Sequence, residues 1–368
     1  MLRGTRRMET SATNIRFSYQ LLLRTMTNTP ANKAIRVKNE LPSQIRVSTG
    51  TAIVIGLMKG KLDAEPSTAY LMTYYDGKCA ANCGFCPQAR TSTSKVGLLS
   101  RVAWPAYPTG IVLQGLEKAV RNGRIERVCI QTLNYPKVFA EICAIVKKLK
   151  QRVSLPVSVS CQPLNSQNLW LLAEAGVNRI GIALDAATEP LFDKVKGAAA
   201  GGPYRWREVQ MLLKVAIGVF GEGNVTTHLI VGLGETEKEA ILAVQECMDL
   251  GVLPAMFAFT PVRGTALANN LQPEVDVYRR VQLARHLIVR GQARAEDMRF
   301  DSKGRVADFG VPKPTLARAI ASGLPFLTSG CPGCNRPFYN EKPSGPLYNY
   351  ARSVQAAELK AIESDLDL

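Results

Sequence analysis

The chain has 368 residues, 46% of them apolar and 21% charged, a composition that is typical of a folded globular protein and excludes wholesale disorder. No uninterrupted apolar run approaches the roughly 18 residues of a membrane-spanning helix, so we expect no membrane partner. The net charge of +16 is compatible with nucleic acid, an anionic surface or an acidic protein as a partner, and charge alone does not choose among them.

Residues 1–44 form a basic N-terminal segment with eight Lys or Arg residues and two Glu residues. Its beginning is rich in Arg, Ser and Thr, a composition that organelle transit peptides share. We favour two other interpretations. The segment is a disordered basic extension of a cytoplasmic protein, or the true translation start is Met8 or Met26 and the residues before it do not belong to the protein. Regular patterning begins only at residue 45.

Beyond residue 71, short runs rich in β-branched and aromatic residues alternate with amphipathic stretches. Six such runs are clear, at residues 71–75, 127–132, 155–160, 178–184, 224–231 and 253–260. The stretches between them carry apolar residues at three-to-four spacing, and Gly176 and Gly251 mark two helix ends. This alternation predicts a parallel sheet covered by helices.

We expect two weaker strand–helix units to follow, near residues 296–300 and 323–328. The chain is then an α/β protein with a full or nearly full (β/α)8 barrel of the TIM type at residues 45–328. The remaining segment, 329–368, contains two cysteines and ends in a short charged helix. In such a barrel the reacting groups gather at the carboxyl ends of the strands.

Three cysteines, Cys79, Cys83 and Cys86, lie within eight residues directly after the first barrel strand. Nine cysteines that are unevenly clustered in a long chain favour metal or redox chemistry over disulfides. A C-x3-C-x2-C loop can hold three corners of an iron–sulfur cluster and leave the fourth iron open to a substrate. Structural zinc, which usually takes four ligands in paired sets, is the main alternative.

The three cysteines, with Phe85 directly before the last of them, resemble the signature of the radical S-adenosylmethionine (SAM) superfamily. The resemblance implies a 4Fe–4S cluster whose open iron binds the amine and carboxylate of SAM, and a full or partial βα barrel. The implied chemistry is one-electron reduction of the sulfonium, which yields a 5′-deoxyadenosyl radical that takes hydrogen from an unactivated carbon.

Residues 228–236 resemble the G-x-I-x-G-x-x-E strand of this superfamily, with matches at Ile230, Gly232 and Glu235. The resemblance implies that Phe85 and Ile230 flank the adenine of SAM. His228 replaces the usual first glycine, which puts close approach of the backbone to the cofactor in doubt there.

Asp185 follows the fourth strand, where biotin synthase, a member of the superfamily, has an acidic residue near the ribose and the substrate. Alternatively, Asp185 or Thr188 caps the next helix. No GGE motif follows the second strand, and Gln131, Thr132 and Asn134 stand there instead. Residues 259–267 resemble the P-x-x-G-T-x-L stretch of the biotin synthase group.

The other six cysteines differ in position. Cys143 and Cys247 fall inside helical patterns, so we assign them to packing. Cys129 and Cys161 lie on or at the end of barrel strands, and the alternation of Cys161 with the valines before it predicts that its thiol points into the barrel. Biotin synthase holds a second cluster with cysteines in matching strands, but here Thr226 stands near the place of its fifth-strand cysteine.

Cys331 and Cys334 form a C-x2-C pair with a Pro-Gly turn between them, so both thiols can reach one site. A zinc half-site would need two more thiolates or imidazoles, and the chain has two histidines. We predict that four thiols share an auxiliary iron–sulfur cluster: Cys129, Cys161, Cys331 and Cys334. A weaker alternative leaves Cys129 in the core. Arg299 either resembles the arginine that biotin synthase points at its second cluster or is a surface arginine.

Insertion of sulfur at an unactivated C–H bond is the natural use of a radical enzyme with a second cluster, and biotin synthase and lipoyl synthase both work in this way. The resemblance to biotin synthase covers about residues 47–330. The closing segment more closely resembles the biotin-synthase-like proteins that make the lipoyl group in pairs. The resemblance therefore implies a sulfur-inserting enzyme that is one component of a lipoyl synthase.

The implied partners are a lipoyl carrier protein or peptide with octanoyl-lysine, a second radical SAM protein, and a reductant such as ferredoxin. Carrier domains are usually acidic, and the net charge of +10 that remains beyond residue 44 would favour their docking. The enzyme alternatives are biotin synthase, which the missing fifth-strand cysteine disfavours, and a radical enzyme with carbon-skeleton chemistry. A zinc-containing nucleic-acid-binding protein is a distant alternative, so we expect no nucleic acid partner.

Overall fold

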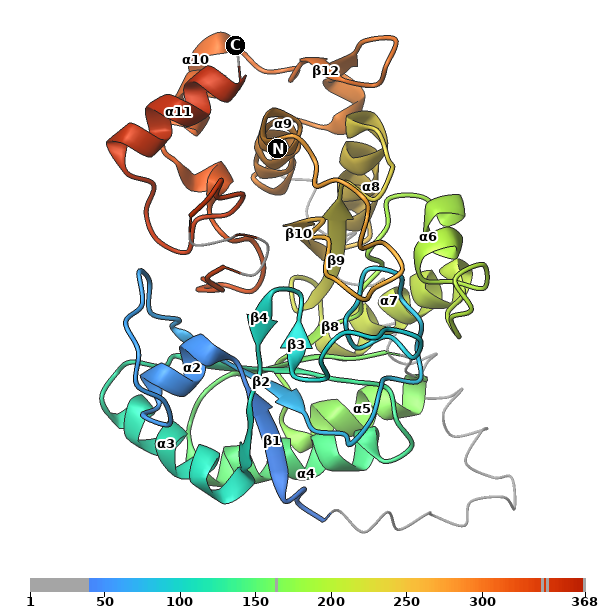
Figure 1. Cartoon of the computed structure of the whole chain (residues 1–368). Coiled ribbons are helices and arrows are strands. Elements are labelled where there is room, and N and C mark those ends of the chain that lie inside the picture. Colours follow the sequence, from blue (N-terminus) through green and yellow to red (C-terminus); the bar gives the residue numbers. More distant parts are fainter. Residues whose placement is uncertain (1–39, 163–164, 339–340, 342–343, 367–368) are drawn as a thin grey trace, which may run out of the picture. The chain divides into compact units, whose positions relative to one another are not determined.

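All six strands predicted from the sequence form, and they lie side by side in one sheet (Figure 1). A computed structural model of the chain describes residues 40–162, 165–338, 341 and 344–366, so most of the predicted N-terminal extension lies outside the described residues. Among the described residues, the parallel strands are β2 (Thr68–Thr73), β6 (Arg127–Gln131), β7 (Val157–Ser160), β8 (Arg179–Gly181), β9 (Val225–Val231) and β10 (Leu253–Ala258).

Two antiparallel strands extend this sheet. β1 (Gln44–Val47) pairs with β2, and β5 (Ala106–Pro108) pairs with β1. In the described part of the chain, β5 and β10 are the two edges, and no ladder joins them. The predicted α/β class with a parallel sheet is confirmed.

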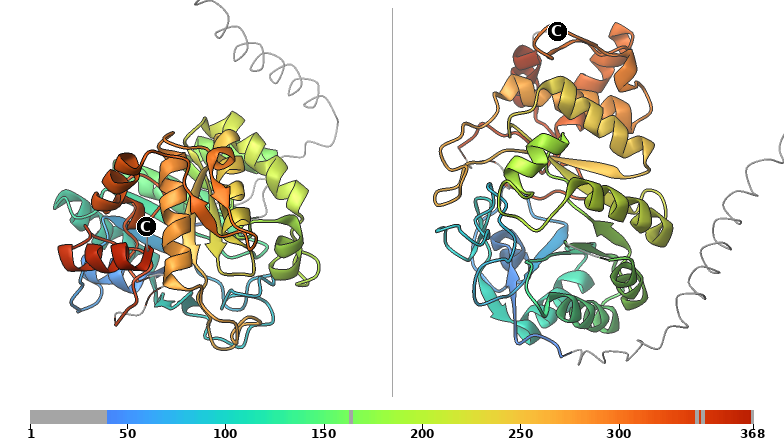
Figure 2. Two further views of the ribbon diagram at one scale, coloured as in Figure 1. Left: turned by 90° about the horizontal axis from the view of Figure 1, so that it is seen from above. Right: turned by 90° about the vertical axis from the view of Figure 1, so that its right-hand side faces the viewer.

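Helices connect the successive parallel strands and pack on the outer face of the sheet (Figure 2). The described helices are α2 (Thr49–Val54), α3 (Thr109–Arg121), α4 (Val138–Arg152), α5 (Ser166–Ala175), α6 (Glu189–Val195), α7 (Trp206–Phe220), α8 (Glu237–Asp249), α9 (Val275–Val289), α10 (Lys313–Ala321) and α11 (Ala356–Leu366). Gly176 and Gly251 follow α5 and α8 with φ of 103° and 81°, as the helix-end prediction requires. Within the described residues, no helix is both long and apolar enough to cross a membrane.

The two faces of the sheet differ in chemistry. In β6, Val128 and Ile130 are fully buried on the side that packs against helices, whereas Cys129 and Gln131 line a pocket on the inner side. Alternation along a strand sends successive side chains to opposite faces. The apolar residues therefore attach the strands to the helices, and the inner face is left for polar and reactive side chains.

The two weaker strand–helix units predicted after β10 do not form, and this part of the fold prediction is wrong. Residues 296–300 contain the end of a 3-10 turn, η1 (Ala295–Asp297), and a two-residue strand, β11 (Arg299–Phe300), which pairs with β12 (Val306–Asp308) outside the main sheet. Residues 323–328 form a second 3-10 turn, η2 (Leu324–Phe326), with Pro325 in its first turn. Proline suits a helical φ and removes a ladder donor, and a short apolar run cannot by itself distinguish a strand from a turn.

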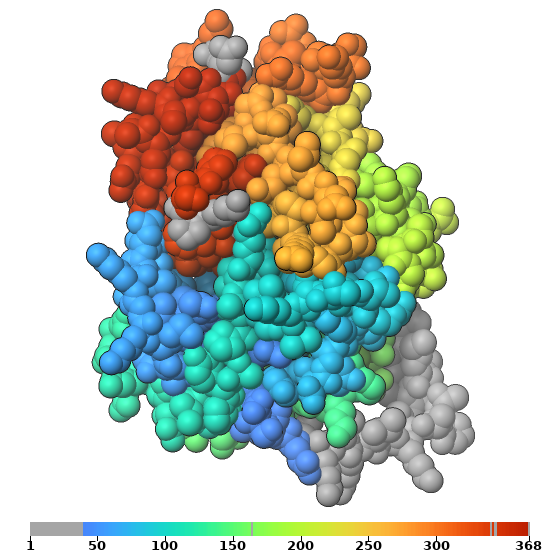
Figure 3. All heavy atoms as spheres, viewed as in Figure 1, coloured from blue at the N-terminus to red at the C-terminus, as the bar shows by residue number. Residues whose placement is uncertain are grey.

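The C-terminal segment crosses the amino ends of the strands. The Met256 N–H of β10 donates to Ser329 Oγ at 2.7 Å, and the Ser67 N–H, just before β2, donates to Asn335 Oδ1 at 3.0 Å. Residues 329–335 therefore run from β10 to the start of β2. Asn335 Nδ2 also donates to the Glu65 carbonyl, and on the surface the C-terminal segment lies next to the loop before β2 (Figure 3). The predicted charged helix is confirmed as α11, while the proposed domain boundaries at residues 44 and 328 remain predictions.

Candidate active site

The loop with Cys79, Cys83 and Cys86 leaves the carboxyl end of β2 and borders a pocket. We call it the carboxyl-end pocket. Other lining residues come from the hairpin of β3 (Leu98–Leu99) and β4 (Val102–Ala103), from β9 and from the end of β10. Its lining is Phe85, Cys86, Pro87, Leu99, Ser100, Asp185, His228, Ile230 and residues 257–260. The pocket lies where the sequence predicts the reacting groups.

Backbone hydrogen bonds hold the three-cysteine loop at both sides. The Gly84 N–H donates to the Val195 carbonyl at the end of α6 at 2.7 Å, and the Leu267 N–H donates to the Gly84 carbonyl at 3.0 Å. The Lys78 ammonium donates to the carbonyls of Pro87 and Ser94 at 2.7 and 2.6 Å. These contacts fix the loop relative to the end of α6 and the segment after β10, so its thiols do not depend on the loop alone for their positions.

The three thiols of the loop influence one another electrostatically. Burial raises the pKa of the Cys83 thiol, the nearby Lys196 ammonium offsets part of this rise, and the charges of Cys86 and Cys79 add to it. Burial also raises the pKa of Cys86 to about 12. Cys79 Sγ accepts a hydrogen bond from the Asn134 N–H at 3.1 Å, from the loop after β6. Such N–H donors stabilise sulfur that carries negative charge.

The donor set fits an iron–sulfur cluster better than a single ion. No three His, Cys, Asp or Glu side chains among the described residues lie close enough together to hold one metal ion. The loop's thiols are nevertheless within electrostatic reach of one another, and a cluster of several irons separates its ligands more widely than one ion does. Binding a cluster would release the thiol protons, because the ligands are thiolates.

Asp185 makes a buried ion pair that the sequence did not reveal. Lys196 Nζ lies 2.6 Å from Asp185 Oδ2, and the two side chains are 2% and 11% exposed. Of the two capping residues that the alternative named, Thr188 caps α6 and Asp185 does not. Asp185 has a φ of 67°, a left-handed conformation that an aspartate adopts at some cost and that is common at functional sites. The ammonium therefore fixes the carboxylate at the pocket.

The β9 motif supplies both lining and a turn. Ile230 lines the carboxyl-end pocket together with Phe85. Gly232 and Glu235 lie outside the described lining and shape the turn after β9, where the Glu235 carboxylate accepts hydrogen bonds from the N–H groups of Gly232 and Leu233. A side chain at position 232 would lie 2.7 Å from a Pro273 carbon, and φ there is 101°, so only glycine fits.

Cys129, Cys331 and Cys334 line a second pocket on the inner face of the sheet. We call these three residues the second thiol group. We call the cavity the amino-end pocket, because the C-terminal segment that borders it runs to the start of β2. Burial, followed by the charges of Cys331 and Cys334, raises the pKa of Cys129 to about 12. The Tyr70 hydroxyl is 3.3 Å from Cys334 Sγ, and Gln131 Nε2 donates to Cys129 Sγ at 3.2 Å.

Cys161 lies on the other face of the sheet, and the prediction that its thiol points into the barrel is wrong. Cys129 and Ser158 are partners across β6 and β7, and Ser158 Oγ is 3.6 Å from Cys331 Sγ, so the side chain of Ser158 faces the second thiol group. Successive side chains along a strand alternate between the two faces, and Cys161, three residues after Ser158, therefore falls on the opposite face. It is buried in the helix-facing core, where its electrostatic neighbour is Cys143 of α4. Cys161 is therefore separated from the other three thiols.

An arginine does face the second thiol group, but it is not the predicted one. Arg299 is an exposed residue of β11 that pairs with Asp308, so the surface alternative is correct. Arg336, two residues after Cys334, lines the amino-end pocket instead, and its guanidinium lies 5.3 Å from the Tyr70 ring and 5.1 Å from the Trp104 ring. Its positive charge lowers the pKa of Cys129, against the larger effect of burial.

The two pockets meet at His228 and Phe257, which line both of them. Their rings pack edge to face with centroids 5.1 Å apart. Burial lowers the pKa of His228 to about 4, so the imidazole is neutral near pH 7. Position 228 thus places a neutral ring between the two thiol groups in place of the expected glycine.

A family model for the radical SAM superfamily matches residues 76–247, which contain the three-cysteine loop, Asp185 and the β9 motif. The chain carries a radical SAM domain. The family implies a 4Fe–4S cluster and SAM as its cofactors, and the donor set of the loop fits that group.

The curated proteins that are similar to this radical SAM chain include biotin synthases. The enzyme of Persephonella marina is 24% identical over 207 residues, 55% of this chain and 57% of that enzyme. The enzyme of Sulfurihydrogenibium is 27% identical over 213 residues, 55% of this chain and 59% of that enzyme. The enzyme of Mycobacterium tuberculosis is 24% identical over 263 residues, 70% of each chain. The chain thus spans less than two thirds of the first two enzymes, and the predicted likeness to biotin synthase is confirmed.

Among solved structures, methylornithine synthase aligns at a TM-score of 0.47 with 14% identity, over 61% of this chain and 62% of that chain. The FeFe-hydrogenase maturase HydG from Carboxydothermus hydrogenoformans aligns at a TM-score of 0.48 with 13% identity, over 77% of this chain and 66% of that chain.

Sequence patterns do not indicate the roles of three residues: Asn134, Lys196 and Arg336. Asn134 stands where a GGE motif is missing, and it acts through its backbone N–H, which any residue except proline offers. Lys196 has no motif around it. Arg336 follows the C-x2-C pair by two residues, and this proximity is the one local signal that could have indicated it.

Proposed function

We propose that this chain is a radical SAM enzyme that inserts sulfur at a C–H bond, with SAM in the carboxyl-end pocket and a second iron–sulfur cluster in the amino-end pocket. When bound, the 4Fe–4S cluster with SAM supplies a 5′-deoxyadenosyl radical that removes hydrogen from carbon. Its ligands would be Cys79, Cys83 and Cys86. The second cluster would be held by Cys129, Cys331 and Cys334, without Cys161.

The other residues of the carboxyl-end pocket would bind and orient the cofactor and the substrate. Phe85 and Ile230 would flank the adenine, since both are apolar and line this pocket. Asp185 would contact the ribose or the substrate, with Lys196 holding its carboxylate in place. Gly232 and Glu235 would contribute through the turn that they form after β9.

One observation carries the proposal: Cys86 of the three-cysteine loop lines one pocket, the second thiol group lines another, and the two pockets share His228 and Phe257. Sulfur insertion requires that one carbon be reached from the hydrogen-abstracting side and from the sulfur-donating side. A carbon held beside His228 and Phe257 would have one thiol group on each side. The second thiol group would then hold the cluster that donates the sulfur.

As the finer proposal, the enzyme is one component of a lipoyl synthase that acts on an octanoyl-lysine of a carrier protein, with a second radical SAM protein and a reductant such as ferredoxin. Thr226 lines the amino-end pocket near the place of the biotin synthase cysteine, which favours a different substrate. The basic body would assist docking of an acidic carrier. Biotin synthase is the second candidate, because the similar curated proteins include biotin synthases.

The test is a product assay with anaerobically reconstituted, reduced protein. The protein is incubated with SAM and an octanoyl-lysine peptide, with and without a second radical SAM protein, and in parallel with the sulfur-free precursor of biotin. We expect the peptide to gain the mass of one or two sulfur atoms. Sulfur in the biotin precursor alone would favour the second candidate, and SAM cleavage without sulfur in either compound would contradict sulfur insertion.

The second thiol group makes a prediction about iron content. The double variant Cys331→Ala/Cys334→Ala is expected to lose about half of the iron while still cleaving SAM, if both sites hold clusters of the same size. Iron is measured chemically, and SAM cleavage is followed as 5′-deoxyadenosine. The matched control is Cys161→Ala, which removes a buried thiol from the helix-facing core and should leave the iron unchanged. Full iron in the double variant would contradict the second cluster.

A further inference from the structure

Three small residues lie side by side on the inner face of the sheet, in adjacent strands. The ladders pair Ser160 of β7 with Gly181 of β8, and Gly181 with Thr226 of β9. All three residues line the amino-end pocket. The three small residues therefore form a shallow strip in the wall of the amino-end pocket. The larger side chain of Gln131 in β6, which pairs with Ser160, borders this strip.

Gly181 has no backbone reason to be glycine. Its φ lies outside the left-handed region that only glycine adopts easily, and its carbonyl accepts a ladder-type hydrogen bond from the Cys161 N–H at 3.1 Å. Glycine in a strand costs stability, and where neither a bulge nor a turn requires it, it often marks a close approach by a ligand. The missing side chain therefore calls for an explanation on the pocket side.

The space at Gly181 is narrow. A methyl group on Gly181 would lie 3.1 Å from Thr226 Oγ1 and 3.5 Å from Ser160 Cβ. Thr226 Oγ1 is held in place by its hydrogen bond to the Ile180 carbonyl at 3.2 Å. A methyl group on residue 181 would thus fill the space between these two side chains. With glycine, the pocket wall stays flat next to His228, which is the next residue of β9 that faces the pocket.

We propose that Gly181 is a specificity-determining residue that lets an unbranched chain lie flat against β7, β8 and β9. The proposal rests on the proposed function and specifies the shape of its substrate. A chain that reaches the region shared by the two pockets must pass the His228 and Phe257 rings, which present carbon-rich surfaces. An unbranched, apolar acyl chain fits such a strip, whereas a methyl branch would need the space that Ser160 and Thr226 occupy.

The experiment compares straight and methyl-branched octanoyl-lysine peptides with four proteins: wild type, Gly181→Ala, Gly181→Val and Thr226→Ala. Each is loaded with iron and sulfide, and both 5′-deoxyadenosine and the sulfur-containing peptide are measured. Gly181→Ala should lower product from the straight chain by about 10-fold or more, and Gly181→Val should abolish it, since one methylene in a pocket is worth roughly 10–200-fold in discrimination. Substrate-free SAM cleavage should persist.

Thr226→Ala supplies a gain of function that misfolding cannot imitate: it should allow the branched peptide to react. In Gly181→Ala/Thr226→Ala, product from the straight chain should return. The control is Gly218→Ala in α7, where a methyl group meets nothing within 4 Å, and it should behave as wild type.

The outcomes separate the two proposals. If the wild type modifies the straight peptide and Gly181→Val does so equally well, the role of Gly181 is wrong while the proposed function stands. If the wild type reacts equally with both peptides, the role of Gly181 is likewise wrong. If the wild type cleaves SAM but modifies neither peptide, the proposed function fails, and the role of Gly181 fails with it.

Discussion

Replacing Cys83 by alanine is expected to abolish the formation of 5′-deoxyadenosine from SAM. Only two thiols would then remain on the loop after β2, and a cluster held at two corners has no stable place in the carboxyl-end pocket. Iron should fall by about half, because the second thiol group is untouched. The measurement compares 5′-deoxyadenosine and iron in wild-type and Cys83→Ala protein, both reconstituted without oxygen.

The control is Cys247→Ala, which removes a buried thiol from α8, far in sequence from either thiol group. It should retain full SAM cleavage and lose only about 1 kcal/mol of stability. Retained cleavage in Cys83→Ala would contradict the assignment of the cluster to this loop. Equal loss in Cys247→Ala would show that the substitution acts through folding.

The strands were predictable because each combines β-branched residues with a position between amphipathic helices. The face of the sheet on which each side chain lies was not predictable. In β7 the valines are buried in the core and the serines line the amino-end pocket, so both sets avoid bulk solvent. A hydrophobic pattern identifies the side that packs on helices. In a sheet with helices on its outer face and pockets on its inner face, that side is the outer one, so the valines next to Cys161 predict the wrong face for its thiol.

The three-cysteine loop was predictable for a different reason: its residues are adjacent in sequence, so spacing alone brings the thiols together. The second thiol group required tertiary information, since about 200 residues separate Cys129 from the C-x2-C pair. The Lys196–Asp185 pair depends on how α6 packs beside β8, and no local pattern encodes this. The segments after β10 were too short for periodicity to distinguish strands from 3-10 turns.

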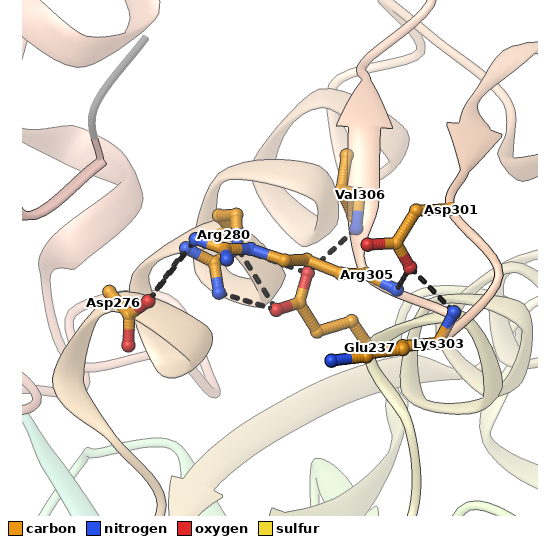
Figure 4. Close-up of polar contacts among 7 residues, drawn as sticks. All are labelled: Glu237, Asp276, Arg280, Asp301, Lys303, Arg305 and Val306. Atoms are coloured by element: carbon orange, nitrogen blue, oxygen red, sulfur yellow. Dashed lines mark hydrogen bonds and ion pairs between the residues drawn. The ribbon is translucent and has the colours of Figure 1, made fainter.

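Glu237 lies at the centre of a buried polar network that joins α8, α9 and the β11–β12 hairpin (Figure 4). Its carboxylate accepts hydrogen bonds from Arg280 Nη2 at 2.6 Å and from the Val306 N–H at 2.9 Å, and the Glu237 and Arg280 side chains are 5% and 3% exposed. Asp276, which is 35% exposed, lies 3.0 Å from Arg280 Nη1. The hairpin turn is held separately by Asp301, which accepts the N–H groups of Lys303 and Arg305.

We expect Glu237→Ala to lower the free energy of unfolding by about 3–5 kcal/mol, because it leaves the Arg280 guanidinium buried with only the rim carboxylate of Asp276 as a partner. The Val306 N–H loses its acceptor as well, which adds a desolvation cost. Chemical denaturation, followed by far-ultraviolet circular dichroism, measures the change. Because α8 begins directly after the turn formed by Gly232 and Glu235, local opening there should also weaken SAM binding.

Two further variants separate the buried charge from simple loss of packing. Asp276→Ala removes the half-exposed partner of the same arginine and should cost about 1 kcal/mol or less, as solvent-screened pairs do. Glu237→Leu/Arg280→Met removes both buried charges and keeps side-chain volume, so it should recover most of the stability that Glu237→Ala loses. If the double variant is as unstable as the single one, the hydrogen bond to Val306 and the packing between α8 and α9, rather than an unpaired charge, account for the loss.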